Sequence, residues 1–185
     1  MIVLKKDDTV YIATSSWNFR DVTSRRGGPV IADNLCIWHP QGRKNRLIAT
    51  TFSSRYADSI RYEKIFPDHP DVKTLVTKTY PHLMDICDTY GLCGDGETPM
   101  YTVFAEGGKA FAVYPNGFVY EIEDMFSKCF GEDSAVYAAY EMLGGDDPKA
   151  FFRAAYKAVS EIAGMRLFPL AMLNTKNNKI EIIKE

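Results

Sequence analysis

Several residue types are scarce in this 185-residue chain, and their scarcity excludes some classes of protein. The cysteines show no CxxC pair and no histidine spacing suited to zinc. They are Cys36, Cys87, Cys93 and Cys129. The three histidines are His39, His69 and His82. None has a serine, cysteine or aspartate at a spacing that indicates a catalytic pair. We therefore expect reduced, mostly packed thiols and surface or turn histidines.

Positive charge and long apolar runs are lacking as well. Lysine and arginine total 22 against 24 acidic residues, a net charge of −2, so the basic patches of a nucleic-acid binder are missing. No apolar run approaches the ~18 residues of a membrane span, and no charged-then-apolar leader precedes the first expected strand. We expect a cytoplasmic protein, complete as given, that binds neither nucleic acid nor membrane.

What the chain does contain is the composition of an ordinary globular domain. Hydrophobic residues make up 46% and charged residues 25%. A chain of this length buries roughly two thirds of the surface that it exposes when unfolded. Because no repeat, linker or low-complexity segment interrupts it, residues 1–185 are expected to form a single domain.

The first half of the chain predicts four strands and two helices. The strands are expected at 2–4 and 10–13, around an Asp7-Asp8 turn, and at 35–38 and 46–50. Ser53 or Ser54 caps the first helix. Apolar spacing assigns Tyr56, Ile60 and Tyr62 to this helix, and Leu83, Ile86, Cys87 and Tyr90 to a second that ends at Gly91.

The second half predicts a meander, two helices and a hairpin. Turns at 106–109 and 115–117 divide 100–124 into three strands. Asp133 or Ser134 caps one helix, and Asp147-Pro148 begins the next, which ends at Gly164. The apolar stripes of the two helices are Val136, Ala139 and Leu143, then Phe151, Ala155, Ala158, Val159 and Ile162. Residues 170–173 and 180–183 form the last hairpin.

Blocks of strands thus alternate with pairs of helices. This order favours antiparallel sheets with helices layered outside them, an α+β sandwich, over alternating βαβ units.

Three stretches resemble the proteasome β-subunit family, and especially its bacterial relative, the HslV peptidase. MIVLKKDDTVYIA resembles the family's first hairpin, and LIATTFSSRYADS its strand-to-helix turn. FGEDSAVYAAYEML, followed by DPKAFFRAAYKAVSEIAGM, resembles its paired inner helices. The resemblance covers nearly the whole chain and is weakest over 67–99. It implies the four-layer αββα sandwich of N-terminal-nucleophile (Ntn) hydrolases.

The catalytic positions that this resemblance implies are all substituted here. In the family, a threonine, serine or cysteine at residue one attacks an amide carbonyl, and the free α-amine, whose pKa lies near 8, serves as the base. The nucleophile position falls on Met1, and the family's aspartate on Ser15. Its lysine falls near Ala32 and its serine on Phe130. We therefore do not expect threonine peptidase activity.

The resemblance also implies a cation site and self-assembly. Backbone carbonyls after the last inner helix hold sodium or a similar monovalent cation in the family, and the matching positions are Gly164, Leu167 and Leu170. No other cofactor is expected. Family members stack into rings, so a homo-oligomeric ring or at least a dimer is expected. Another proteasome-like subunit or an ATPase are the further partners that the resemblance suggests.

Three functions remain open from the sequence. We favour a self-assembling, non-catalytic scaffold or binding protein that has lost the peptidase site. The second is an active hydrolase of the same fold, with an altered N-terminus or with Cys36, Cys129 or Ser15 as its nucleophile. The third is a regulator that caps or inhibits another proteasome-like peptidase.

Overall fold

Two antiparallel sheets form the centre of the molecule. The computed structural model describes residues 1–15, 36–40, 43–51, 54–93 and 100–185, and within these each sheet has five strands. The first sheet has the order β10-β9-β2-β1-β8, and the second the order β3-β4-β5-β6-β7. The strands are β1 Ile2–Lys6, β2 Thr9–Ser15, β3 Ile37–Trp38, β4 Arg46–Thr50, β5 Thr102–Glu106, β6 Lys109–Val113, β7 Val119–Glu121, β8 Met125–Ser127, β9 Leu170–Asn174 and β10 Asn177–Ile183.

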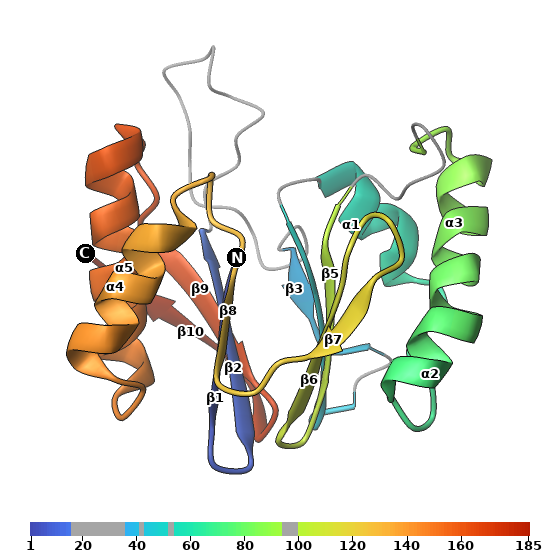
Figure 1. The fold of residues 1–185 in the computed structure, drawn as a ribbon, viewed down its shortest axis with the longest axis horizontal. Coiled ribbons are helices and arrows are strands. Elements are labelled where there is room, and N and C mark those ends of the chain that lie inside the picture. The colour runs from blue at the N-terminus through green and yellow to red at the C-terminus, as the bar shows by residue number, and fades with distance from the viewer. Residues whose placement is uncertain (16–35, 41–42, 52–53, 94–99) are drawn as a thin grey trace.

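Helices cover the outer face of each sheet, which gives four layers (Figure 1). On the first sheet lie α4 (Asp133–Leu143) and α5 (Pro148–Ala163). On the second lie α1 (Ser54–Arg61) and a helical run made of α2 (Val72–Thr74), the π-helical segment η4 (Leu75–Thr79) and α3 (Tyr80–Thr89). The expected αββα sandwich is confirmed. Among the described residues, no helix has both the length and the apolar character to cross a membrane.

Alternate side chains of residues 1–4 lie on opposite faces of the first sheet and belong to two different hydrophobic clusters. Met1 and Val3 belong to the cluster between the sheets, whereas Ile2 and Leu4 belong to the cluster beneath α4 and α5. Successive side chains of a strand point to opposite faces, so a strand covered on both faces is apolar throughout. The run MIVL therefore reflects burial on both sides.

Most of the predicted elements are present, but some details of the predictions are wrong. Strand β8 and the helical run before Tyr80 were not expected. Tyr62 lies beyond the end of α1 and is 85% exposed. Leu143 and Ile162 are also exposed, because Val136 and the stripe of Phe151, Ala155 and Val159 already cover the sheet.

The ends of α5 agree with the prediction. The Asp147 side chain accepts hydrogen bonds from the backbone N–H groups of Lys149 and Ala150, which satisfies two free donors of the first turn. Gly164 ends the helix in the left-handed conformation, with φ +63°, which glycine adopts without a Cβ penalty.

Candidate functional site

The candidate site surrounds Met1, the position at which the resemblance places a nucleophile. This residue directly precedes β1, which lies between β2 and β8 in the first sheet. Its side chain is 1% exposed and belongs to the inter-sheet core, together with Phe126 and Val3. The position therefore holds a thioether packed among apolar side chains, without a hydroxyl or a thiol.

The backbone of Met1 extends the pairing of β1 with β8. Ile2 is opposite Ser127 in this ladder. One residue further out, the Met1 α-amine donates a hydrogen bond of 2.9 Å to the Lys128 carbonyl, and the Lys128 N–H donates one of 3.0 Å to the Met1 carbonyl. Burial lowers the pKa of this α-amine, while the nearby Cys129 opposes the shift. The amine is thus held in the sheet.

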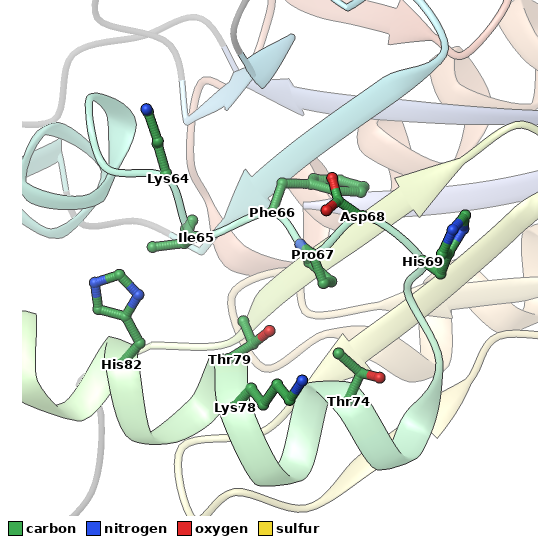
Figure 2. A pocket seen from close by; sticks show the side chains of 10 residues that line it. All are labelled: Lys64, Ile65, Phe66, Pro67, Asp68, His69, Thr74, Lys78, Thr79 and His82. Carbon is green, nitrogen blue, oxygen red and sulfur yellow. The ribbon is translucent and has the colours of Figure 1, made fainter.

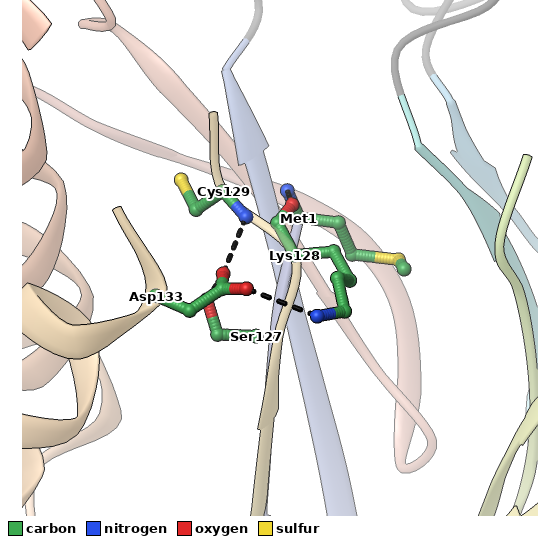
Figure 3. Close-up of polar contacts among 5 residues, drawn as sticks. All are labelled: Met1, Ser127, Lys128, Cys129 and Asp133. Carbon is green, nitrogen blue, oxygen red and sulfur yellow. Dashed lines mark hydrogen bonds and ion pairs between the residues drawn. The ribbon is translucent and has the colours of Figure 1, made fainter. Parts of the chain in front are cut away.

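Asp133, the first residue of α4, connects three groups of the segment that follows β8 (Figure 3). Its carboxylate accepts hydrogen bonds of 2.8 Å from the Ser127 hydroxyl and from the Cys129 N–H. It also accepts one of 3.1 Å from the Lys128 ammonium group. The expected helix cap at Asp133 or Ser134 is therefore wrong: the N-cap is Glu132, and the Asp133 carboxylate faces back toward residues 127–129.

A sharp turn between β8 and α4 allows the Asp133 carboxylate to face residues 127–129. Phe130 and Gly131 both have positive φ, at +56° and +84°, and together they reverse the chain between β8 and α4. Glycine adopts this conformation readily, whereas a phenylalanine there costs about 1–2 kcal/mol. Phe130, where the resemblance places a serine, packs instead against the cluster beneath the helices.

The Lys128 ammonium group contacts both the Asp133 carboxylate and the Tyr101 ring. Partial burial opposes its charge, but the hydrogen bond and the negative charge of Asp133 outweigh this and raise the pKa of the Lys128 ammonium group. The ammonium nitrogen also lies 5.3 Å from the centroid of the Tyr101 ring, within the range of a cation–π contact. A lysine held in its charged form is a structural partner of Asp133 and a poor proton acceptor.

The two thiols nearest to Met1 are poorly suited to nucleophilic attack. Cys129 is fully buried, and burial raises the pKa of its thiol. Burial likewise raises the pKa of Cys36. Because the thiolate is the reactive form, a raised pKa in an apolar setting makes a cysteine inert. Tyr156 lies near Cys129, and its hydroxyl donates a hydrogen bond of 2.8 Å to the Ala13 carbonyl.

Ser15 and the predicted cation ligands lie together at the end of β2. Ser15 is opposite Leu170 in the β2–β9 ladder, and its hydroxyl donates a hydrogen bond of 2.7 Å to the Leu167 carbonyl. Gly164 is the C-cap of α5. The Leu167 carbonyl thus has a protein partner, and a monovalent cation at Gly164, Leu167 and Leu170 stays a prediction. In the described part of the chain, no group of three or more His, Cys, Asp or Glu residues is arranged to hold a metal ion.

The structure brings together only some of the residues singled out in the sequence. Met1 and Cys129 adjoin the Asp133 network, Ser15 lies against the 167–170 segment, and Ala32 falls outside the described residues. Sequence reasoning missed the roles of Ser127 and Lys128. The available signal was an aspartate two residues after the Phe130-Gly131 turn, with polar residues on the other side of that turn.

Comparison with known proteins supports the fold. No family model and no curated protein matches the sequence. Solved structures do match. Two structures of BPH from Thiobacillus denitrificans, a proteasome/HslV-like protein, match with a TM-score of 0.71 and 17% identity over 96% of this chain. The match covers 98% of the BPH chain in the complex with epoxomicin and 97% of it in the structure without epoxomicin. HslV from Trypanosoma brucei has a TM-score of 0.59 and 12% identity over 94% of this chain and 97% of its own. The chain has the HslV/proteasome-like Ntn fold.

Proposed function

We propose that this chain is an HslV/proteasome-like subunit that has lost the N-terminal threonine peptidase site and acts as a self-assembling, non-catalytic scaffold or binding protein. The observation that carries the proposal is the Met1 side chain, which is 1% exposed in the core between the two sheets. In the family that the chain resembles, this position presents the nucleophile to the substrate. Here it is occupied by an apolar side chain that is packed between the two sheets.

The surroundings of Met1 support the same conclusion. The family chemistry needs an α-amine that can take a proton from an adjacent hydroxyl or thiol. The Met1 amine has the lowered pKa that suits a base, but its hydrogen bond runs to the Lys128 carbonyl. Burial raises the pKa of the neighbouring Cys129 thiol, which works against its use as a replacement nucleophile.

Exposed apolar side chains on α4 and α5 support the self-assembling part of the proposal. Tyr137, Met142 and Leu143 on α4, and Ile162 on α5, are all exposed. Subunits of the family that the chain resembles stack through these helices. A cytoplasmic ring or dimer formed through this face is part of the proposal, as is a monovalent cation at the end of α5.

An electrophile test separates a scaffold from a hydrolase. The protein is incubated with epoxomicin, which is bound by the similar BPH from Thiobacillus denitrificans, and in parallel with iodoacetamide. The intact mass is then measured, and BPH serves as the positive control for epoxomicin. We expect no epoxomicin adduct on native protein, and no rapid alkylation of Cys36 or Cys129. Rapid labelling of a single residue would overturn the proposal, and peptide mapping would identify the nucleophile.

The same mass spectrum reports the identity of the first residue. A mass that begins at Met1 agrees with the packing described above. A natural protein that begins instead at a threonine, serine or cysteine would contradict the proposal and would revive the peptidase interpretation.

A further inference from the structure

A cavity of about 370 Å³ lies on the second sheet's side of the molecule, outside the network around Met1 (Figure 2). One wall is the segment 64–69, which follows α1. The other wall is the helical run of α2, η4 and α3, which contributes Thr74, Lys78, Thr79 and His82. Its volume lies at the lower end of the range for small-molecule sites, so it suits a small ligand.

A π-helical turn gives the helical wall its polar face. The Tyr80 N–H donates to the Leu75 carbonyl, five residues earlier, instead of to the carbonyl four residues earlier. Pro81 explains the widening: a proline inside a helix has no N–H and collides with the carbonyl four residues before it. Thr74, directly before the π-helical segment, and Thr79, its last residue, both line the cavity. Figure 2 shows the side chains of Thr74, Thr79 and His82 rising from one face of the run. Such π-turns frequently occur at functional sites.

The opposite wall combines the apolar Ile65, Phe66 and Pro67 with the polar Lys64, Asp68 and His69, and contacts with Arg46 hold it in place. Ile65 and Phe66 are both buried. The Arg46 guanidinium lies 4.8 Å from the centroid of the Phe66 ring, and its Nη2 donates a hydrogen bond of 2.9 Å to the Asp68 carbonyl. Arg46 Nε in turn donates a hydrogen bond of 2.6 Å to Glu106. These contacts fix the position of the wall, so the pocket is preformed.

The side chains that face the cavity from the helical run are hydrogen-bond donors or carry positive charge. Figure 2 shows the Lys78 ammonium group beside the threonines of that wall, whereas the Asp68 carboxylate points away from it. Lys64 adds a second ammonium group to the lining and also points away from the helical wall. The nearby Asp71 accepts a hydrogen bond of 2.6 Å from the Thr74 N–H. Its carboxylate is therefore occupied at the start of α2.

We propose that this pocket binds a small organic anion, with a carboxylate or phosphate group on an apolar body. The anionic group lies against Lys78, Thr74 and Thr79, whose ammonium and hydroxyl groups can donate to it. The apolar body lies against Ile65 and Phe66. Hydrogen bonds to charged groups are stronger than those between neutral partners, so the charge of the ligand supplies much of the selectivity.

Titration with three probes of similar ring size tests the proposal. Benzoate, phenyl phosphate and uncharged benzyl alcohol are each added to the full-length protein. Binding is followed by calorimetry and by the amide NMR shifts of Ile65, Thr74 and Thr79. We expect one or both anions to bind saturably with shifts at these residues, and the stronger anion identifies the preferred group. We expect benzyl alcohol to bind at least about tenfold more weakly.

Two lysine variants provide the matched comparison. Lys78→Gln is expected to weaken binding of the preferred anion about tenfold. Lys73→Gln removes the same charge from an exposed neighbour that does not line the cavity, and it should change the affinity less than about twofold. Thr79→Val, which keeps the shape but removes the hydroxyl, is expected to weaken binding as well. Undisturbed NMR spectra of the free variants verify their folding.

Three results would overturn the proposal. One is the lack of saturable binding by either anion. Another is equal affinity for benzyl alcohol, which would make the site an apolar one. The third is an equal loss of affinity in Lys73→Gln and Lys78→Gln, which would reduce the effect to general surface charge.

Discussion

Met1 and Lys128 form a reciprocal backbone pair: the amine of Met1 donates to the Lys128 carbonyl at 2.9 Å, and the Lys128 N–H donates to the Met1 carbonyl at 3.0 Å. The pair fixes the first residue in the sheet and directs its side chain to the inter-sheet core. It also connects Met1 to Asp133, because the same Lys128 contacts that carboxylate through its ammonium group.

Met1→Ala is expected to destabilise the protein by about 2–4 kcal/mol, because truncating a fully buried methionine removes apolar contacts and leaves a cavity. The variant is expressed behind an initiator methionine that is removed before alanine, which intact mass verifies. Urea unfolding gives the free energy of unfolding. Tyr62→Ala is the control, since Tyr62 is 85% exposed, lies outside the proposed assembly face and should change the stability by less than about 0.5 kcal/mol. Equal losses in the two variants would contradict the buried position of Met1.

Asp133→Ala is expected to lower the free energy of unfolding by about 2–3 kcal/mol, because the Ser127 hydroxyl, the Cys129 N–H and the Lys128 ammonium group all lose an acceptor. Chemical denaturation measures the change. The control is Asp146→Ala. The Asp146 carboxylate is fully exposed and lies 3.1 Å from the Lys6 ammonium group, the same distance as between Asp133 and Lys128. We expect that variant to be much less affected, because exposed ion pairs contribute little. A similar cost in both variants would show that the Asp133 network is no more important than a surface pair.

The Met1 amine is expected to make stability rise with pH below about 8, its ordinary pKa. Burial lowers the pKa of this amine in the folded protein. Between the folded and the unfolded pKa, the unfolded chain therefore binds a proton that the folded chain does not. Stability rises through that window, by at most about 1.4 kcal/mol per pH unit, and the rise ends near pH 8.

Unfolding curves between pH 6 and 8.5 test this dependence. The control is the same chain with an acetylated α-amine, which lacks the titrating amine and keeps every other group of the chain. The slope of the free chain should exceed that of the acetylated one. Identical slopes would contradict a buried amine.

Self-association is expected to depend on the exposed face of α4. Light scattering over a range of concentrations should show a dimer or a larger ring. Leu143→Glu together with Met142→Glu should weaken this assembly at least about tenfold, because two charges would be buried in an apolar contact. Tyr62→Glu changes an equally exposed apolar residue beyond the end of α1, and it should leave assembly unchanged. A monomer at every concentration would contradict the assembly proposal.

Much of the fold could be predicted because turn residues and helix caps lie next to the elements that they begin or end. The hairpin of β1 and β2 is marked by its Asp7-Asp8 turn, and α5 by Asp147 at its start and Gly164 at its end. Strand β8 has no comparable signal. It is three residues long, and its partner β1 lies more than a hundred positions earlier, so only the assembled sheet defines it as a strand.

The sequence predicts which catalytic groups are missing from the candidate site, but not which side chains contact one another there. That Met1 has no hydroxyl follows from the sequence alone. That Asp133 faces back toward Lys128 depends on the positive φ angles at Phe130 and Gly131, and no spacing rule fixes these for phenylalanine. The π-turn before Pro81 was missed for a related reason, since a proline within a periodic run is ordinarily taken as the boundary of a helix.

The strand order of the first sheet has a consequence for synthesis on the ribosome. The hairpin of β1 and β2 is made long before its outer neighbours β8 and β9, which begin at Met125 and Leu170. A two-stranded hairpin is marginally stable by itself, and its unpaired edges can pair with other chains. Until β8 and β9 have been made, the nascent chain therefore carries an apolar hairpin, MIVL included, with both edges open. Chaperones that shield strand edges would therefore matter most for this chain before β8 and β9 are made.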